Sequence, residues 1–257
     1  GAQAGPSASG RPLSSALGIA GYIEERVDME YKDGFVEGTL VHSKDGLKPI
    51  GEIKAGDFVL SHTEDPLKGT ERGYKRVTRT VSFEDRQILQ FCWTRNHGNG
   101  EFDDAFATPN PLVWSYPQGW LPIGKVPYTS SGGEEWFGRN LVMADGSVGE
   151  RYEINGVYTT KKREVAYVHC DGFGSGNYVD LSLSPHRFLD EEEESQYEAE
   201  REDQDSDDWL VYATKVYHLE VEGWHTFFVG KTGLLVHDTS TRLAPVPIHL
   251  VDIDPVR

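Results

Sequence analysis

Short runs in which apolar and polar residues alternate fill most of the chain after residue 33. A period of two is the pattern of strands that bury one face of a sheet. Turns that contain glycine separate the runs, among them KDG (44–46), EG (222–223) and KTG (231–233). The pattern predicts one all-β domain over residues 34–238, in which residues 215–238 form three strands joined by two turns.

Helical spacing of apolar residues occurs only near the start, in SSALGIAGYIEERVDMEY (14–31). Because Gly18 and Gly21 interrupt this stretch, residues 1–33 are interpreted as a linker that can form a helix. No other long helix is predicted. The last segment, residues 239–257, contains three prolines and is expected to be an extended tail or an edge strand.

Acidic residues are concentrated in one segment. Residues 190–208 contain twelve acidic residues and one arginine, which is −11 of the net charge of −17. Such a run repels itself and has little apolar area to bury, so it is predicted to be a solvated, mobile insertion loop. The alternative is a contact surface for a basic partner. Its sign argues against nucleic acid as the partner.

The two cysteines and the apolar content limit the function classes. Cys92 and Cys170 are too few for a disulfide framework, and Cys92, in QILQFCW, is predicted to be a buried thiol. No apolar stretch reaches the length of a membrane span. The start, GAQAGPSASGRP, lacks the apolar core of a classical signal peptide. We therefore expect synthesis in the cytoplasm and no membrane partner.

Four separated blocks resemble the Hint (hedgehog/intein) family in the family's order. They are FVEGTLVHSKDGLKPIGEIKAGDFVLS (35–61), FATPNPLVWSYPQGWLPIGKV (106–126), LVMADG (141–146) and VYHLEVEGWHTFFVGKTGLLVHD (216–238). The second block is similar to the family's T-P-x-H-P-F strand, and the fourth to its C-terminal ending in VHN. The blocks are most similar to pretoxin Hint domains of bacterial Rhs and other polymorphic toxins. The resemblance implies a horseshoe-shaped β fold with pseudo-two-fold symmetry and both chain ends at one site, here with an acidic insertion loop at 190–208.

The resemblance also implies a reaction, autoproteolysis of the kind used in protein splicing. In active members a first-block cysteine attacks the preceding carbonyl carbon in an N-to-S acyl shift, and a second-block histidine protonates the departing amide nitrogen. A threonine of the same block orients the bond. At the far end, a histidine assists cyclisation of the terminal asparagine. An amide needs this convergence of nucleophile, acid and oxyanion donor because it is a poor electrophile.

Carried over residue by residue, the site is only partly present. Gly34 stands at the nucleophile position, Pro111 at the position of the second-block histidine, and Asp238 at that of the terminal asparagine. The expected site positions are Gly34, Thr108, Asn110, Pro111, His225, His237 and Asp238. The three replacements predict a degenerate or trapped module that needs no cofactor. His225, His237 and Asp238 are also weak candidates for zinc ligands.

Three functions remain open from the sequence. The first is a pretoxin Hint module of a polymorphic toxin that a specialised secretion system exports, with the rest of a toxin chain or a cognate immunity or chaperone protein as partner. The second is a non-catalytic module that binds or presents a partner. The third is an effector, a hydrolase or nuclease that acts in a rival cell. His186, in SPHRF, is either an acid or base of a second site or a structural residue.

Overall fold

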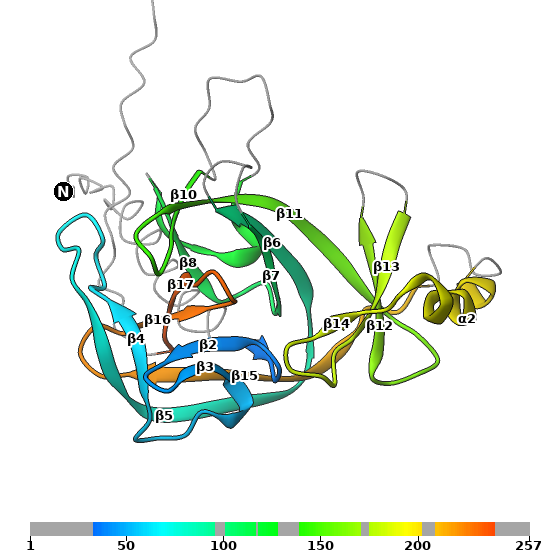
Figure 1. Cartoon of the computed structure of the whole chain (residues 1–257), viewed down its shortest axis with the longest axis horizontal. Helices are drawn as coiled ribbons and strands as arrows, with labels where there is room; N and C mark the ends of the chain where they lie inside the picture. Colours follow the sequence, from blue (N-terminus) through cyan, green and yellow to red (C-terminus); the bar gives the residue numbers. More distant parts are fainter. Residues whose placement is uncertain are drawn as a thin grey trace, which may run out of the picture. The chain divides into compact units, whose positions relative to one another are not determined.

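The computed structural model describes residues 33–95, 101–116, 118–127, 139–170, 175–201 and 209–239. The helix expected at 14–31 and the tail expected beyond residue 239 lie outside these ranges. Within them, the chain forms seventeen strands connected as one antiparallel sheet (Figure 1). The predicted all-β class is confirmed.

The secondary structure elements have the following bounds. The strands are β1 (Phe35–Val36), β2 (Leu40–Ser43), β3 (Gly46–Pro49), β4 (Phe58–His62), β5 (Arg72–Gln87), β6 (Leu89–Arg95), β7 (Phe102–Ala107), β8 (Leu112–Ser115), β9 (Gly119–Pro122), β10 (Arg139–Val142), β11 (Val148–Thr159), β12 (Val165–Cys170), β13 (Ser175–Asp180), β14 (Arg187–Phe188), β15 (Ala213–Val221), β16 (Thr226–Val229) and β17 (Leu234–His237). Two 3₁₀ turns, η1 (Ile50–Glu52) and η2 (Ile123–Lys125), and one helix, α2 (Glu191–Arg201), complete the described part.

The short strand β1 lies between β7 and β15. Phe35 is opposite Ala107 of β7 on one side and opposite Tyr217 of β15 on the other. Its ring is fully buried in the largest apolar cluster of the domain, which fixes the start of the domain in the interior. Residue 34 is therefore enclosed by two strands that are distant in sequence.

The long strands β5 and β15 run side by side (Figure 1). Exposed and less exposed positions alternate along much of β5, as expected for a strand with one face toward water. Bulges interrupt the register between Thr214 and Val216 and between Glu220 and Val221. The pairing makes β15 a wall of the core, against which both ends of the described domain pack.

The three final strands confirm the pattern predicted for residues 215–238. After β15, a turn leads into β16, and a second turn leads into β17, with Gly230 and Gly233 at φ of 80° and 78°. Glycine is the residue that adopts such positive φ values without strain. All residues of β16 and β17 are buried, and β17 continues the sheet through β8. This places residues 237 and 238 in the interior.

The acidic segment is not a loop throughout, because residues 191–201 form the helix α2. Asp190 caps it: the Glu193 N–H donates to the Asp190 carboxylate, and the Asp190 N–H donates to the Glu193 carboxylate. Tyr197 is buried and stacks near Tyr178 of β13 at 5.1 Å between ring centroids. The prediction of a loop is therefore wrong for residues 191–201, which are helical, whereas most of the helix residues whose side chains are described are exposed, as predicted for a solvated segment.

Cys92 on β6 is a free, partly buried thiol. Burial is the main cause that raises the pKa of this thiol, and the carboxylates of Asp104 and Glu153 act in the same direction. A thiol in this state fits the predicted inert role. Among the described residues, no helix has the length and apolarity that a membrane crossing requires.

Candidate functional site

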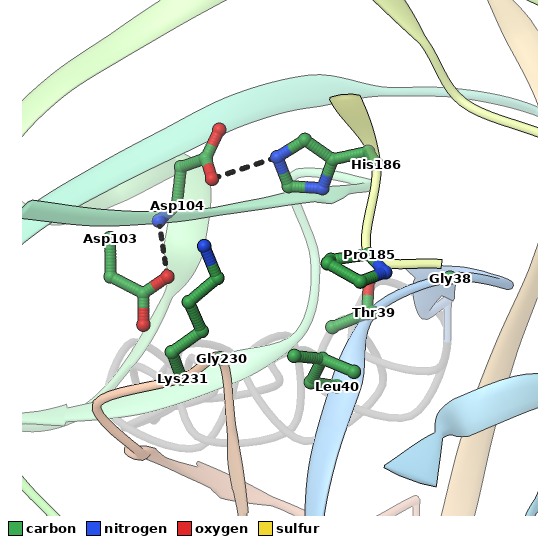
Figure 2. Close-up of a pocket in the computed structure, with 9 residues that line it drawn as sticks. All are labelled: Gly38, Thr39, Leu40, Asp103, Asp104, Pro185, His186, Gly230 and Lys231. Carbon is green, nitrogen blue, oxygen red and sulfur yellow. Dashed lines mark hydrogen bonds and ion pairs between the residues drawn. The ribbon is translucent and has the colours of Figure 1, made fainter. Parts of the chain in front are cut away.

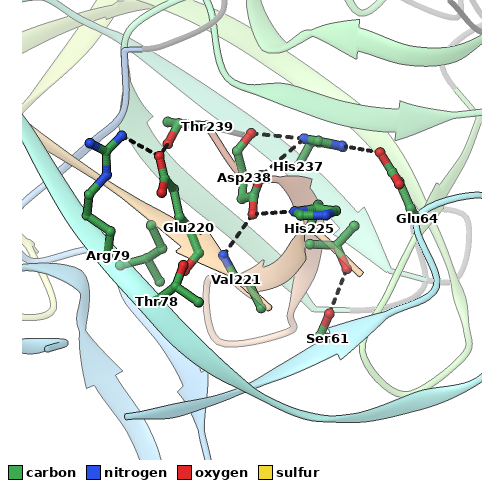
Figure 3. A network of polar contacts seen from close by, with 12 residues as sticks. Ser61, Glu64, Thr78, Arg79, Glu220, Val221, His225, His237, Asp238 and Thr239 are labelled. Carbon is green, nitrogen blue, oxygen red and sulfur yellow. Dashed lines mark hydrogen bonds and ion pairs between the residues drawn. The ribbon is translucent and has the colours of Figure 1, made fainter. Parts of the chain in front are cut away.

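The expected site positions fall into two groups. The N-terminal half comprises Gly34, Thr108, Asn110 and Pro111, together with the preceding residue Asp33. The Thr108 N–H donates to the Gly34 carbonyl oxygen at 3.0 Å, so the first and second sequence blocks meet as the resemblance implied. The C-terminal half comprises His225, His237 and Asp238, together with Glu64, which sequence reasoning did not identify (Figure 3).

The nucleophile position has no room for a side chain. A Cβ atom placed on Gly34 would lie 2.1 Å from the carbonyl oxygen of Tyr217 and 2.6 Å from its carbonyl carbon. Both atoms belong to the backbone of β15, which pairs with β1 at this point. A cysteine at position 34 therefore requires the sheet itself to shift.

The rest of the N-terminal half provides a hydroxyl but no acid. Thr108 is fully buried, and its hydroxyl has no hydrogen-bond partner among the residues that the structure describes. Pro111 is buried as well, and its carbonyl oxygen accepts from the Ile123 N–H, so it serves the backbone of η2. A proline side chain has no proton to give, so the acid that the family's reaction needs is absent at this position.

Asp33 lies immediately before the position of the expected cut. Burial raises the pKa of its carboxyl group, while Arg86, at 3.7 Å, and a hydrogen bond from the Asn110 side chain act in the opposite direction. Asn110 thus contacts the residue before the expected cut through a neutral amide. That amide is a weak substitute for an imidazole as a proton donor.

His218 of β15 is a buried histidine that sequence reasoning left as an ordinary strand residue. The Leu219 N–H donates to its Nδ1 at 2.9 Å, and its Nε2 has no partner in the described ranges. Burial lowers the pKa of His218 to about 4, so the ring is neutral at pH 7. Its burial depends on the pairing of β15 with β1, which no local pattern in the sequence shows.

Both ring nitrogens of His237 contact oxygen atoms. Nδ1 lies 2.9 Å from the Asp238 carbonyl oxygen, and Nε2 lies 2.9 Å from the carboxylate Oε1 of Glu64 (Figure 3). The side chain is only 1% exposed. His237 is therefore held at both ends of its ring inside the protein.

The Asp238 carboxylate is enclosed by donors. Its Oδ2 accepts from the Val221 N–H at 2.7 Å and lies 3.2 Å from Nδ1 of His225. The Asp238 N–H in turn donates to the His225 carbonyl oxygen. His225 has φ of 55°, a left-handed conformation that is uncommon for a residue other than glycine. A strained residue held by two contacts to one partner indicates a tightly specified geometry.

Strand β15 connects the two halves. Tyr217 faces β1, and two residues later the Leu219 carbonyl oxygen accepts from the Thr239 N–H. His218, between them, is close enough to Asp238 and His237 for both charges to influence its pKa. Gly34 and Asp238, one from each half, thus both lie against β15.

His186 lies elsewhere and has a partner. Its Nε2 is 2.9 Å from a carboxylate oxygen of Asp104, and its ring packs edge-on against Phe106. His186 and Asp104 line a small pocket, and none of the seven expected site positions lines it (Figure 2). Across the described ranges, no group of three or more His, Cys, Asp and Glu side chains is arranged to hold a metal ion.

No family model and no curated protein matches the chain. The chain is similar in structure to a bacterial intein-like domain from Clostridium thermocellum, with 21% identity over 80% of this chain and 99% of that one, at a TM-score of 0.48. A DnaB intein from Synechocystis sp. PCC 6803 is 10% identical over 80% of this chain and 99% of that one, with a TM-score of 0.46. The gp41-1 intein is 15% identical over 80% of this chain and 98% of that one, with a TM-score of 0.41.

Proposed function

We propose that this chain is a Hint-type module that has lost self-cleavage at residue 34 and serves as part of a secreted bacterial polymorphic toxin. The observation that carries the proposal is the contact of 2.1 Å between a Cβ at position 34 and the Tyr217 carbonyl oxygen. An engineered Cys→Gly change in an otherwise active site would leave a space for the thiol. The closed geometry favours a degenerate module over a trapped active one.

The missing acid supports the same conclusion. Even with a nucleophile in place, the amide nitrogen of residue 34 must be protonated as it leaves, and Pro111 cannot do this. General acid–base assistance is typically worth about 10² to 10⁴ in rate. Thr108 contributes a backbone N–H to the Gly34 carbonyl oxygen, and its hydroxyl remains unpartnered. This hydrogen bond fixes the Gly34–Phe35 peptide and not the Asp33–Gly34 bond, at which the family's cut would fall.

A module that stays uncut remains covalently joined to its neighbours, so its role is to hold or present them. Its partners are then the rest of a larger toxin chain, or an immunity or chaperone protein, and export uses a specialised secretion system. The acidic face of α2 is a contact surface for a basic partner. An effector function has less support, because in the described part of the chain the imidazoles and carboxylates of the C-terminal half bond to one another.

The test is a time course of intact mass on the purified chain with dithiothreitol or hydroxylamine at pH 7. We expect no cleavage between Asp33 and Gly34 over several days, because residue 34 has no thiol to form a thioester. The same chain unfolded in urea gives the background rate of hydrolysis. A faster, reagent-dependent release of residues 1–33 from the folded chain would contradict the proposal.

A further inference from the structure

The small pocket in Figure 2 lies where three connections meet strand β7. They are the connection between β13 and β14, the turn before β2 and the turn between β16 and β17. The pocket is lined by one imidazole, His186, one amine, Lys231, and two carboxyl groups, Asp103 and Asp104. A few polar groups that converge on a concave surface are the usual form of a ligand site. The chemistry of these four groups therefore indicates what the pocket can bind.

The contact with Asp104 determines which nitrogen of His186 faces the pocket. An ionised carboxylate only accepts hydrogen bonds, so the contact of 2.9 Å between Nε2 and the Asp104 Oδ1 places a hydrogen on Nε2. Nδ1 is then the nitrogen that can gain or lose a proton, and it faces away from Asp104 (Figure 2). The rings of Phe106 and Phe188 meet the imidazole edge-on at 4.8 and 5.8 Å and fix its plane. The ring is therefore oriented as a base.

Two buried amides hold the Asp104 carboxylate from behind. Gln90 of β6 donates to the Asp104 Oδ2 at 2.6 Å, and Asn155 of β11 donates to the Gln90 Oε1 at 2.9 Å. Gln90 and Asn155 are only 5% and 3% exposed. A buried amide is costly unless its hydrogen bonds are made, and here they are aligned toward one carboxylate by neighbouring strands. Asp104 thus has the place of the carboxylate that orients the base in a catalytic dyad.

The charges that line the pocket favour a neutral ligand. Lys231 extends into the pocket and makes no ion pair within the described ranges (Figure 2). Asp103 is held in place, because it accepts from the Thr232 N–H at 2.8 Å and from the Thr232 hydroxyl at 2.9 Å. Two carboxylates against one ammonium disfavour an anion, and the ammonium repels a cation. A neutral carbonyl compound, whose oxygen accepts from Lys231, fits this pattern.

We propose that the pocket is a second catalytic site, which hydrolyses a small, neutral carboxylic ester. His186 Nδ1 takes a proton from water as the water oxygen bonds to the ester carbonyl carbon, and the charge that develops on the carbonyl oxygen lies beside Lys231. The bond from this carbon to the alcohol oxygen then breaks, and the proton passes from His186 to the departing alkoxide. The products are an acid and an alcohol, and the ring returns to its first state.

Asp104 acts through His186 and is a positioning residue. The site goes beyond the proposed function and does not depend on it, because none of the seven expected positions of the Hint-type site lines the pocket.

The test follows release of p-nitrophenolate from p-nitrophenyl acetate by the purified chain at pH 7.5. We expect many turnovers per chain. His186→Gln should lower kcat/KM by about 100-fold or more, because a general base is typically worth about 10² to 10⁴ in rate. A glutamine side chain can still donate to Asp104, so this variant removes the base and keeps the contact. Lys231→Met should lower kcat/KM by about tenfold or more, and an unchanged rate would overturn the assignment of Lys231.

Asp104→Asn tests the positioning role. It should lower kcat by about tenfold or more and leave KM within about twofold, because Asp104 orients the base and does not touch the ester. Urea denaturation of the same variant measures its stability. A loss of stability with kcat unchanged would show that Asp104 only tethers the connection between β13 and β14, and would overturn its part in the reaction.

The matched controls are His169→Gln and Lys54→Met. His169 is half-buried and packs on Trp209, Lys54 is exposed, and neither residue lines the pocket. We expect both variants to keep the native rate. A native chain no faster than the same chain unfolded in urea, a single release per chain, or equal effects of His186→Gln and His169→Gln would overturn the proposal. Failure of the proposed function is a separate result, since it would be visible as a cut before Gly34.

Discussion

Thr108, in the N-terminal half of the site, and Thr226, beside the C-terminal half, are both fully buried. Within the described part of the chain the Thr108 hydroxyl has no partner, whereas the Thr226 hydroxyl donates to the His62 carbonyl oxygen and accepts from the His62 N–H. His218, which lies on β15 between the two halves, has no partner at Nε2 among the described residues, whereas His237 is bonded at both nitrogens. The buried hydroxyl compared in the N-terminal half is thus unsatisfied within the described structure, whereas the buried groups compared in and beside the C-terminal half have partners.

The largest expected effect comes from adding one methyl group at position 34. Gly34→Ala places a Cβ against the β15 backbone, and overpacking of this kind should lower the free energy of unfolding by about 3 kcal/mol or more. Urea denaturation measures the change. In the control, Gly73→Ala, the new Cβ lies 3.7 Å from Trp224, so stability should change by less than about 1 kcal/mol. Equal tolerance at both positions would show that position 34 has room for a nucleophile.

His218 predicts a pH dependence of stability. Its pKa is about 4 in the folded chain and 6.5 as a free side chain, so the unfolded chain takes up the proton first as pH falls. The neutral His218 ring contributes fully to the free energy of unfolding above pH 6.5, and this contribution is lost between pH 6.5 and 4. The loss amounts to about 2 kcal/mol between pH 7 and pH 5. His218→Asn keeps an acceptor for the Leu219 N–H but does not titrate. We expect the variant to lose about 2 kcal/mol less than the native chain over this interval.

The two threonines give the smallest and most closely matched effects. Thr226→Val leaves the buried His62 N–H and carbonyl oxygen unpaired and should cost about 2 kcal/mol, whereas Thr108→Val removes an unpartnered hydroxyl and should be neutral or stabilising by up to about 1 kcal/mol. Thermal or urea unfolding distinguishes the two. Equal losses would mean that the Thr108 hydroxyl has a partner in solution, and the contrast between the halves would fail.

Much of the fold followed from alternation and turn glycines, because both are local properties. The strands of residues 215–238 and their two turns are where the pattern placed them. The helix α2 was not predicted because the prediction relied on the acidic composition of the whole segment. That average takes no account of two specific residues, the capping Asp190 and the buried Tyr197. A capping box within an acidic run is visible in sequence, but whether the helix docks depends on Tyr178 of β13.

The sequence identified residues that the structure places together, but not how they are packed. Motif spacing identified His225, His237 and Asp238, which the structure brings into contact. It could not identify Glu64, because the contact with His237 depends on the tertiary fold alone. The clash at Gly34 was hidden for the same reason, since the obstructing oxygen belongs to Tyr217 in another sequence block.

We propose that the C-terminal half of the site keeps a geometry suited to the family's reaction and that the N-terminal half does not. The most direct measurement is a time course of intact mass, at pH 7 with added thiol, on one chain that carries both Gly34→Cys and Asp238→Asn, with near-ultraviolet circular dichroism to verify folding. Each half then has its nucleophile. We expect release of residues 239–257 while residues 1–33 stay attached. Release of residues 1–33 from the folded chain, or a C-terminal segment that stays attached, would contradict it.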